Sequence, residues 1–312
     1  MSVAPRVRPA PAKDAVAGGP FVFSPRSALH SFAMPLPIPT LDHVVVNVRD
    51  RIDEAAETYR RLGFTLTPRG YHTLGSINHL AMFGTEYLEL IAVPPGDTRR
   101  PEILATPEGL NGLVWGTEDA DHTYEALRSA GVPVEPPQQF SRPVALADGP
   151  RDATFRTVHV TPGTTQAGRL YFCHHLTRNL VWRDEWRHHP NAAIGVARAV
   201  IAAEDPAKLG GLFSRMFGMD AVREIANGRR LLAGLSQFDV ITPAALAGAF
   251  GDAVPDSGGR SEFMVALTLR TRSLAAVAAA LRAGGIQAAR REDDRIVVPT
   301  AAAFGLVLEF RE

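Results

Sequence analysis

Two polar side chains stand out in this 312-residue chain because each interrupts an apolar, strand-like run. In LDHVVVNV, the period of two places His43 with Val45 and Asn47, on the face opposite to Val44, Val46 and Val48. In YLELIAV it separates Glu89 from Leu88 and Leu90. A buried histidine or carboxylate is costly unless it finds a partner, and a shared divalent metal would satisfy both. The pair therefore indicates a candidate metal site.

The elements around this pair recur four times along the chain. Each copy has a strand, a helix and further strands, which is a βαβββ unit. In the first copy, further strands are expected near 65–67, 78–83 and 87–93. The helices end at glycines spaced roughly as in an internal repeat, namely Gly63, Gly131, Gly218 and Gly284 or Gly285.

The first copy resembles a known family. It is similar to the glyoxalase-like branch of the vicinal oxygen chelate superfamily, and the residues that carry the resemblance are Asp42, His43, Gly63, Phe64, His72, Gly75 and the run 87–91. The resemblance implies an α+β fold in which paired βαβββ modules form half-open, cup-shaped sheets, with a divalent metal on the concave floor. Many members use four protein ligands, two from each module.

Pairing neighbouring modules predicts three segments. Residues 1–40, rich in Pro and Ala, are expected to be a flexible lead-in, residues 41–186 a first cup with the metal site, and residues 187–312 a second cup. Trp182, near the connection, is expected to pack between the cups or to cover the site.

Histidine placement favours the first cup as the metal site. Nine of the ten histidines lie between His43 and His189. In the second module, FCHHL corresponds to YLELI, which sets His174 at the position of Glu89, and a shift of one residue would present His175 instead. His43, Glu89 and one of these two form a set that suits Fe(II) and tolerates Mn(II), Co(II), Ni(II) or Zn(II).

These residues also have plainer interpretations. A strand histidine is more often a hydrogen-bonded packing residue than a ligand, and the pair His174 and His175 could equally begin a solvated loop. His72 lies in the glycine-containing segment GYHTLGSINHL, which predicts a loop over the pocket. We expect Glu89 and His72 to handle the proton or contact the substrate.

Counting back from the helix-ending glycines, the counterparts of His43 are Asn111, Arg198 and Val265. Asn111 stands where a fourth ligand would be, which leaves the identity of the metal open. The second cup has no histidine, so it is expected to be catalytically degenerate. Arg198 and Glu309 there are interpreted as an internal ion pair or an anion-facing pair.

Composition narrows the function further. Lys plus Arg and Asp plus Glu are both 33, so we expect neither a nucleic-acid nor a membrane partner, and no apolar run approaches roughly 20 residues. The single Cys173 excludes a disulfide within the chain and favours a cytoplasmic setting. A homodimer is left open.

The resemblance implies a metal-dependent lyase or isomerase acting on a small molecule with vicinal oxygens. One alternative is a ring-cleaving, extradiol-type dioxygenase, which is weakened because family dioxygenases with four modules usually keep their metal in the second cup. The other is a metal-free, drug-sequestering protein like the bleomycin-resistance members, and the 7% aromatic content slightly disfavours it.

Overall fold

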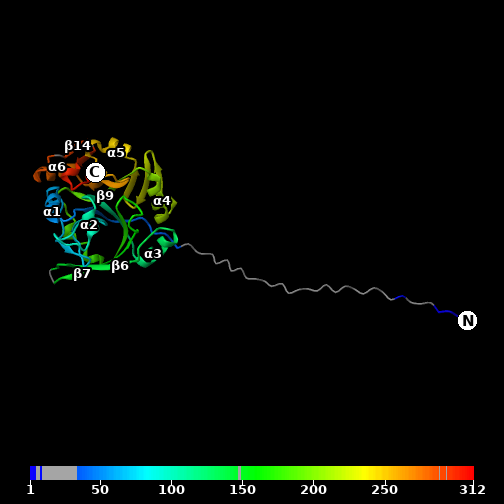
Figure 1. Cartoon of the computed structure of the whole chain (residues 1–312). Coiled ribbons are helices and arrows are strands. Elements are labelled where there is room, and N and C mark those ends of the chain that lie inside the picture. The colour runs from blue at the N-terminus through cyan, green and yellow to red at the C-terminus, as the bar shows by residue number, and fades with distance from the viewer. Residues whose placement is uncertain (5–7, 9–33, 147–148, 288, 293) are drawn as a thin grey trace. The chain divides into compact units, whose positions relative to one another are not determined.

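The sequence order of strand, helix and three strands is present four times (Figure 1). The computed structural model describes residues 1–4, 8, 34–146, 149–287, 289–292 and 294–312. Most of the predicted lead-in, residues 1–40, lies outside the described residues.

The bounds of the elements are as follows. The first module contains β1 (Leu41–Asn47), α1 (Ile52–Arg61), β2 (Gly70–Tyr71), β3 (Ile77–Met82) and β4 (Tyr87–Ala92). The second contains β5 (Gly109–Gly116), α3 (Ala120–Ser129), β6 (Gln138–Val144), β7 (Arg151–His159) and β8 (Arg169–His175). The third contains β9 (Ala193–Ala203), α4 (Pro206–Phe217), β10 (Val222–Ile225), β11 (Gly228–Ala233) and β12 (Ser236–Ile241). The fourth contains β13 (Glu262–Thr271), α6 (Leu274–Ala283), β14 (Arg290–Glu292), β15 (Arg295–Val298) and β16 (Val307–Arg311). Connecting helices are α2 (Pro101–Ala105) and α5 (Pro243–Phe250).

Neighbouring modules pair into one sheet each, which confirms the predicted α+β fold of paired βαβββ modules. The first sheet has the strand order β2-β3-β4-β1-β5-β8-β7-β6, and the second has the matching order β10-β11-β12-β9-β13-β16-β15-β14. In the first sheet β1 runs parallel to β4 of its own module and antiparallel to β5 of the next. The first strands of two modules thus lie side by side at the centre of each cup.

The first module departs from the sequence prediction at one strand. The expected strand near 65–67 is absent, and the short β2 pairs with β3 instead. Beyond β2, the two ends of the first sheet meet, because the Thr73 amide donates to the Ser141 carbonyl over 2.9 Å. This contact joins β2 to β6 and nearly closes the cup.

The outward faces of both sheets and their helices share one apolar core. It includes Tyr59 of α1, Leu127 of α3 and Leu281 of α6. The fully buried Trp115 on β5 belongs to the same core, with its ring centroid 5.0 Å from that of Phe217 on α4. The helices therefore cover the convex sides, and burial of this shared core couples the two sheets.

Gly63 shows why the first helix must end where it does. α1 ends at Arg61, and Gly63 has φ +87°, a conformation that glycine adopts at little cost. A Cβ at this position would lie 2.7 Å from the Cβ of Ala280 on α6. The predicted helix-ending glycine is thus also a point of close approach between the two halves.

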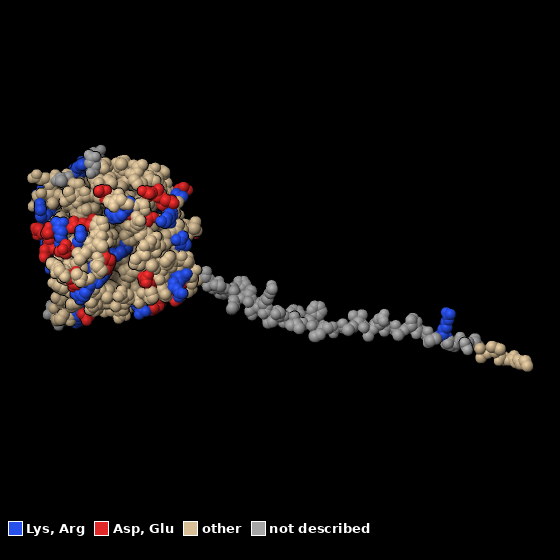
Figure 2. Space-filling view, viewed as in Figure 1, with Lys and Arg blue, Asp and Glu red and all other residues tan. Residues whose placement is uncertain are grey.

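Figure 2 shows acidic and basic side chains interspersed over the visible face of the described region. Among the described residues, no helix is both long and apolar enough to cross a membrane.

Candidate functional site

His43 lies at the centre of the first sheet on its concave face. Its strand partners are Tyr87 on β4 and Val114 on β5. The imidazole is 3% exposed and stacks on the Tyr87 ring, with centroids 4.4 Å apart. This placement follows from strand alternation, since Val44 and Val46 enter the convex core instead.

Asp42 reaches the same imidazole although it is the neighbouring residue in the strand. The pairing between β1 and β5 shifts register between Leu41 and His43, and such a bulge re-aims side chains. Asp42 Oδ1 lies 2.5 Å from His43 Nδ1. Burial alone would raise the pKa of the Asp42 carboxyl, but the charge and hydrogen bond of His175 and the hydrogen bond of His43 hold it well below its usual range. The ionised carboxylate therefore accepts a hydrogen bond from the Nδ1–H group of His43.

With Nδ1 protonated, the lone pair of His43 Nε2 faces the interior of the cup. The Tyr171 hydroxyl lies 3.0 Å from Nε2, and the nearest Glu89 oxygen, Oε2, lies 3.6 Å from it. Burial and the nearby Glu89 carboxylate raise the pKa of Tyr171 well above its ordinary value, so its hydroxyl stays protonated and donates to Nε2. The imidazole of His43 is thus hydrogen-bonded at Nδ1 by Asp42 and at Nε2 by Tyr171.

Glu89 is the next member of this network. Its Oε1 accepts a hydrogen bond of 2.6 Å from Asn78 Nδ2. Burial would raise the pKa of Glu89, but the charges that His43 and His72 carry when protonated, together with the Asn78 hydrogen bond, lower it on balance. Glu89 is therefore a buried, ionised carboxylate beside the His43 lone pair.

His72 lies on the turn after β2, within the lining of the same cavity. Its Nδ1 is 2.8 Å from Ser76 Oγ, and its Nε2 is 3.3 Å from Asn78 Nδ2. Burial, assisted by the charges of Arg142 and Arg100, lowers the pKa of His72 to about 4. His72 is neutral at neutral pH and touches Glu89 only through Asn78.

The two candidate histidines of β8 lie apart from the His43 lone pair. His175 shares the face of Tyr171 and Cys173, but its Nε2 binds Asp42 Oδ1 over 3.0 Å, on the far side of the His43 ring. By alternation, His174 lies on the opposite face from His175. Among the described residues, the group of three close metal-ligating side chains is Asp42, Cys173 and His175, so the expected set of two histidines and Glu89 is not assembled.

Two residues of this network were not anticipated from the sequence. Tyr171, and not His174, is the second-module residue that meets His43, and the alternation of RLYFCHH would have placed it on the face of His175. Asn78 could not be found in that way, because its role depends on the β3–β4 register, where it pairs with Ile91.

These residues line a cavity of about 990 Å³ inside the first cup. Its walls combine polar groups such as His43, Glu89 and Arg142 with apolar ones such as Phe155. Trp182 lies behind this lining, with its ring 4.7 Å from that of His175 and 5.5 Å from that of Tyr87. Trp182 thus belongs to the concave core of the first cup and does not pack between the cups.

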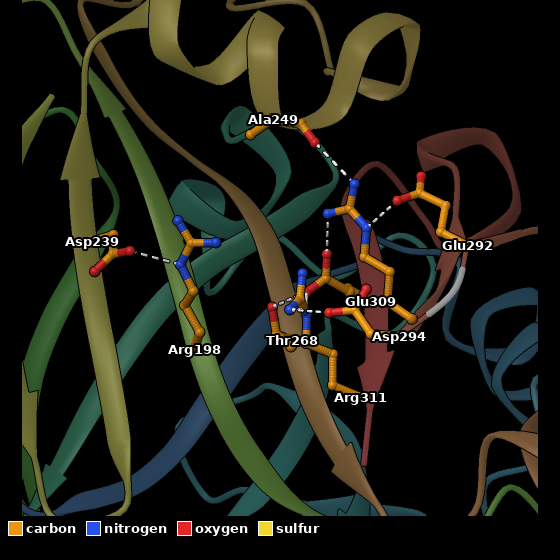
Figure 3. Close-up of polar contacts among 9 residues, drawn as sticks. Arg198, Asp239, Ala249, Thr268, Glu292, Asp294, Glu309 and Arg311 are labelled. Carbon is orange, nitrogen blue, oxygen red and sulfur yellow. Dashed lines mark hydrogen bonds and ion pairs between the residues drawn. The ribbon is translucent and has the colours of Figure 1, made fainter. Parts of the chain in front are cut away.

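The expected pairing of Arg198 with Glu309 in the second cup is wrong. Arg198 Nε donates to Asp239 Oδ2 over 2.7 Å (Figure 3). Arg230 Nε donates to the other Asp239 oxygen over 2.6 Å. Asp239 is fully buried, and its strand, β12, lies beside β9. Both of its oxygens are therefore occupied by guanidinium groups.

Glu309 is occupied in the same way (Figure 3). It accepts from Arg295 and Arg311, each over 2.7 Å, and from the Thr268 hydroxyl over 3.1 Å. The chain has no histidine after His189, and both of these second-cup carboxylates are paired with arginines.

The fold and site define a protein built from paired βαβββ modules with a polar cavity in its first cup. A family model described as a glyoxalase-like domain matches residues 41–217, more than half of the chain. The chain therefore belongs to the glyoxalase-like domain family. A search of curated proteins found no match.

Solved structures agree on the fold. A hypothetical protein from Staphylococcus aureus aligns with a TM-score of 0.62 and 13% identity, over 88% of this chain and 99% of that one. A mutant of 4-hydroxymandelate synthase from Streptomyces coelicolor aligns with a TM-score of 0.54 and 12% identity, over 88% of this chain and 92% of that one. A fusion of a xylose isomerase-like TIM barrel with 4-hydroxyphenylpyruvate dioxygenase aligns with a TM-score of 0.56 and 11% identity, over 90% of this chain and 50% of the fusion.

Proposed function

We propose that this protein is a metal-dependent enzyme of the lyase or isomerase type that acts on a small oxygenated molecule in the first cup. The observation that carries the proposal is the buried His43–Glu89 pair, with 3.6 Å between Nε2 and Oε2. A metal with ligand bonds of about 2.0–2.2 Å holds neighbouring ligand atoms roughly 3 Å apart, so the donor set fits one divalent ion.

His43 and Glu89 would hold the ion, with the Tyr171 oxygen as a third neighbour. Asp42 supports this assignment, because ligating histidines commonly donate their other ring N–H to a carboxylate. A divalent ion bound there would polarise two vicinal oxygens of a substrate and lower the pKa of the coordinated group.

The protein side of the reaction is proton transfer and exclusion of water. Glu89 is ionised and can accept a proton at Oε2, while Asn78 fixes its other oxygen. His72 is neutral and lines the same cavity, where it can contact the substrate. Tyr87 stacks on His43, and Trp182 packs edge-on against Tyr87, so this face of the imidazole is shielded from solvent.

The dioxygenase alternative draws support from one structural neighbour, the fusion that contains 4-hydroxyphenylpyruvate dioxygenase. In this chain, however, the second-cup carboxylates Asp239 and Glu309 are paired with arginines. We therefore place an iron-dependent reaction, if one occurs, at His43 and Glu89 in the first cup.

The test is metal analysis of protein purified without added metal, compared with His43→Ala and Glu89→Gln. We expect the wild type to contain about one equivalent of a transition metal, both variants to lose most of it, and the far-UV circular dichroism of all three to agree. A drug-sequestering protein would instead contain no metal and bind its ligand equally well after treatment with a chelator. If His43→Ala keeps its metal, the site has been placed wrongly.

A further inference from the structure

Arg142, on β6, is a buried cation without a partner. It is 4% exposed and lines the cavity of the first cup. Within the described part of the chain, no residue forms a hydrogen bond or an ion pair with its guanidinium group, and Nη2 is fully buried and unsatisfied. Such a group is costly to maintain unless something else neutralises it.

The fold provides a specific place for this side chain. Arg142 crosses from β6 to the opposite end of the sheet, where its Cδ would lie 2.9 Å from a Cβ built on Gly70. Gly70 therefore leaves the space that the arginine stem fills. The seam between Thr73 and Ser141 holds the two edges together directly beside it. The unpaired cation is thus part of a built pocket wall.

Arg169, at the start of β8, adds a second positive charge to the cavity lining. Its Nη2 is also buried without a partner among the described residues. The other charged side chains of the lining, apart from Glu89, are paired, bound to backbone or exposed: Arg99 with Asp97, Arg100 with Glu102, Arg260 with the Ser257 carbonyl, and Glu135.

The charge balance of the cavity then favours a monoanion. In the metal-free cup, the two unpaired arginines face the single carboxylate of Glu89, and Arg260 is balanced by Glu135, which leaves an excess of one positive charge. His72 and His159 do not add to it at neutral pH, because burial lowers the pKa of each to about 4. One monoanionic group would neutralise the lining.

One part of the remaining wall, near Arg142, is apolar and aromatic. Phe140 and Phe155 stack with centroids 5.2 Å apart, and the His72 ring packs edge-on against Phe140 at 5.3 Å. Leu80 and Ile91 line the same cavity. A ligand that fits this cavity has an apolar body and one anionic end.

We propose that the cavity binds a monocarboxylate with an apolar or aromatic body, that Arg142 binds its carboxylate, and that Arg169 supplies further positive potential. The guanidinium fork matches the two oxygens of a carboxylate. This inference rests on the proposed function in one respect, namely that the monocarboxylate is then the class of substrate. Binding of the monocarboxylate itself requires neither the metal nor turnover.

The test is a binding comparison in the presence of a chelator. Phenylacetate, benzoate and octanoate are titrated into the full-length protein, each against its uncharged primary amide, by calorimetry. We expect at least one acid to bind about tenfold or more tightly than its amide, because charge-assisted hydrogen bonds are lost in the amide. In Arg142→Met this preference is expected to fall to within about twofold, while amide binding is unchanged.

Arg99→Gln is the matched control, since Arg99 lines the same cavity but already pairs with Asp97. It should keep the preference for the acid. Because Arg142→Met removes an unpaired buried charge, its melting temperature should equal or exceed that of the wild type. If Arg142 had only a structural role, the melting temperature of the variant would be lower. If the methionine variant does not fold, Arg142→Lys should weaken acid binding selectively, because it lacks the planar fork.

The proposal is overturned if no acid is preferred over its amide, if Arg142→Met keeps the preference, or if inorganic phosphate binds as tightly as the best acid through Arg142. Failure of the proposed enzymatic function gives a different result: a protein without metal or turnover would still show the Arg142-dependent preference. His43→Ala should likewise keep it.

Discussion

Asp42 Oδ1 lies 2.5 Å from His43 Nδ1, although the two residues are neighbours on one strand. The register shift in the β1–β5 pairing allows this contact, and it fixes the tautomer in which His43 Nε2 is free to accept. The same Asp42 oxygen is 3.0 Å from His175 Nε2. The Asp42 carboxylate therefore orients His43, a candidate metal ligand. It also binds His175, which the sequence suggested as a second metal ligand.

Asp42→Asn should weaken metal binding without removing a ligand. The amide cannot carry the charge that stabilises the Nδ1–H form of His43, and loss of such a supporting carboxylate typically costs about 10–100-fold in metal affinity. Competition with a chromophoric chelator measures the change. Asp97→Asn, which removes a carboxylate that pairs with Arg99 away from His43, should leave the affinity as it is. Equal affinities for wild type and Asp42→Asn would contradict the assigned role.

Glu309→Gln should destabilise the protein without affecting the first cup. It leaves Arg295 and Arg311 without their buried carboxylate, and we expect the free energy of unfolding to fall by about 1–3 kcal/mol. Denaturant unfolding gives the value, and metal content should not change. Glu292→Gln is the control, since Glu292 also pairs with Arg295 but is half-exposed. Metal loss in Glu309→Gln would move the site to the second cup.

Stability should fall on acidification between about pH 6.5 and pH 4. Burial lowers the pKa of His72 and of His159 to about 4, from 6.5. In that interval the unfolded chain binds more protons than the folded one. The free energy of unfolding therefore increases as pH rises through the interval and decreases as pH falls. Urea unfolding at pH 7.5 and pH 5 measures the difference. It should shrink in His72→Gln and His159→Gln, and an unchanged pH dependence in both variants would argue against the shifts.

Trp115→Ala should destabilise both sheets together. Trp115 lies on β5, but its ring packs on Phe213 and Phe217 of α4 and on Phe238 of β12. Removing a fully buried tryptophan typically costs about 3–5 kcal/mol. We expect one unfolding transition by circular dichroism and by fluorescence, shifted to lower denaturant. The half-exposed Trp186 offers the control, with a smaller shift for Trp186→Ala. Two separate transitions would show that the cups unfold independently.

The sequence alone determined the local architecture. Strand alternation separates His43 and Glu89 from the valines and leucines beside them, and the repeated glycines end four helices, because both depend on side chains a few residues apart. The fold class followed from the repetition of this pattern. The family resemblance rested on the same residues of the first module.

The tertiary structure decided which side chains meet. Sequence comparison offered His174 or His175 to His43, but the register between β5 and β8 brings Tyr171 there and leaves His175 to Asp42. The unpaired Arg142 had no signal in the sequence, since an arginine on an edge strand is normally solvated. Its burial arises only because β2 and β6 meet across the sheet and Gly70 leaves it room. Such contacts between distant strands depend on sheet closure, which no local pattern specifies.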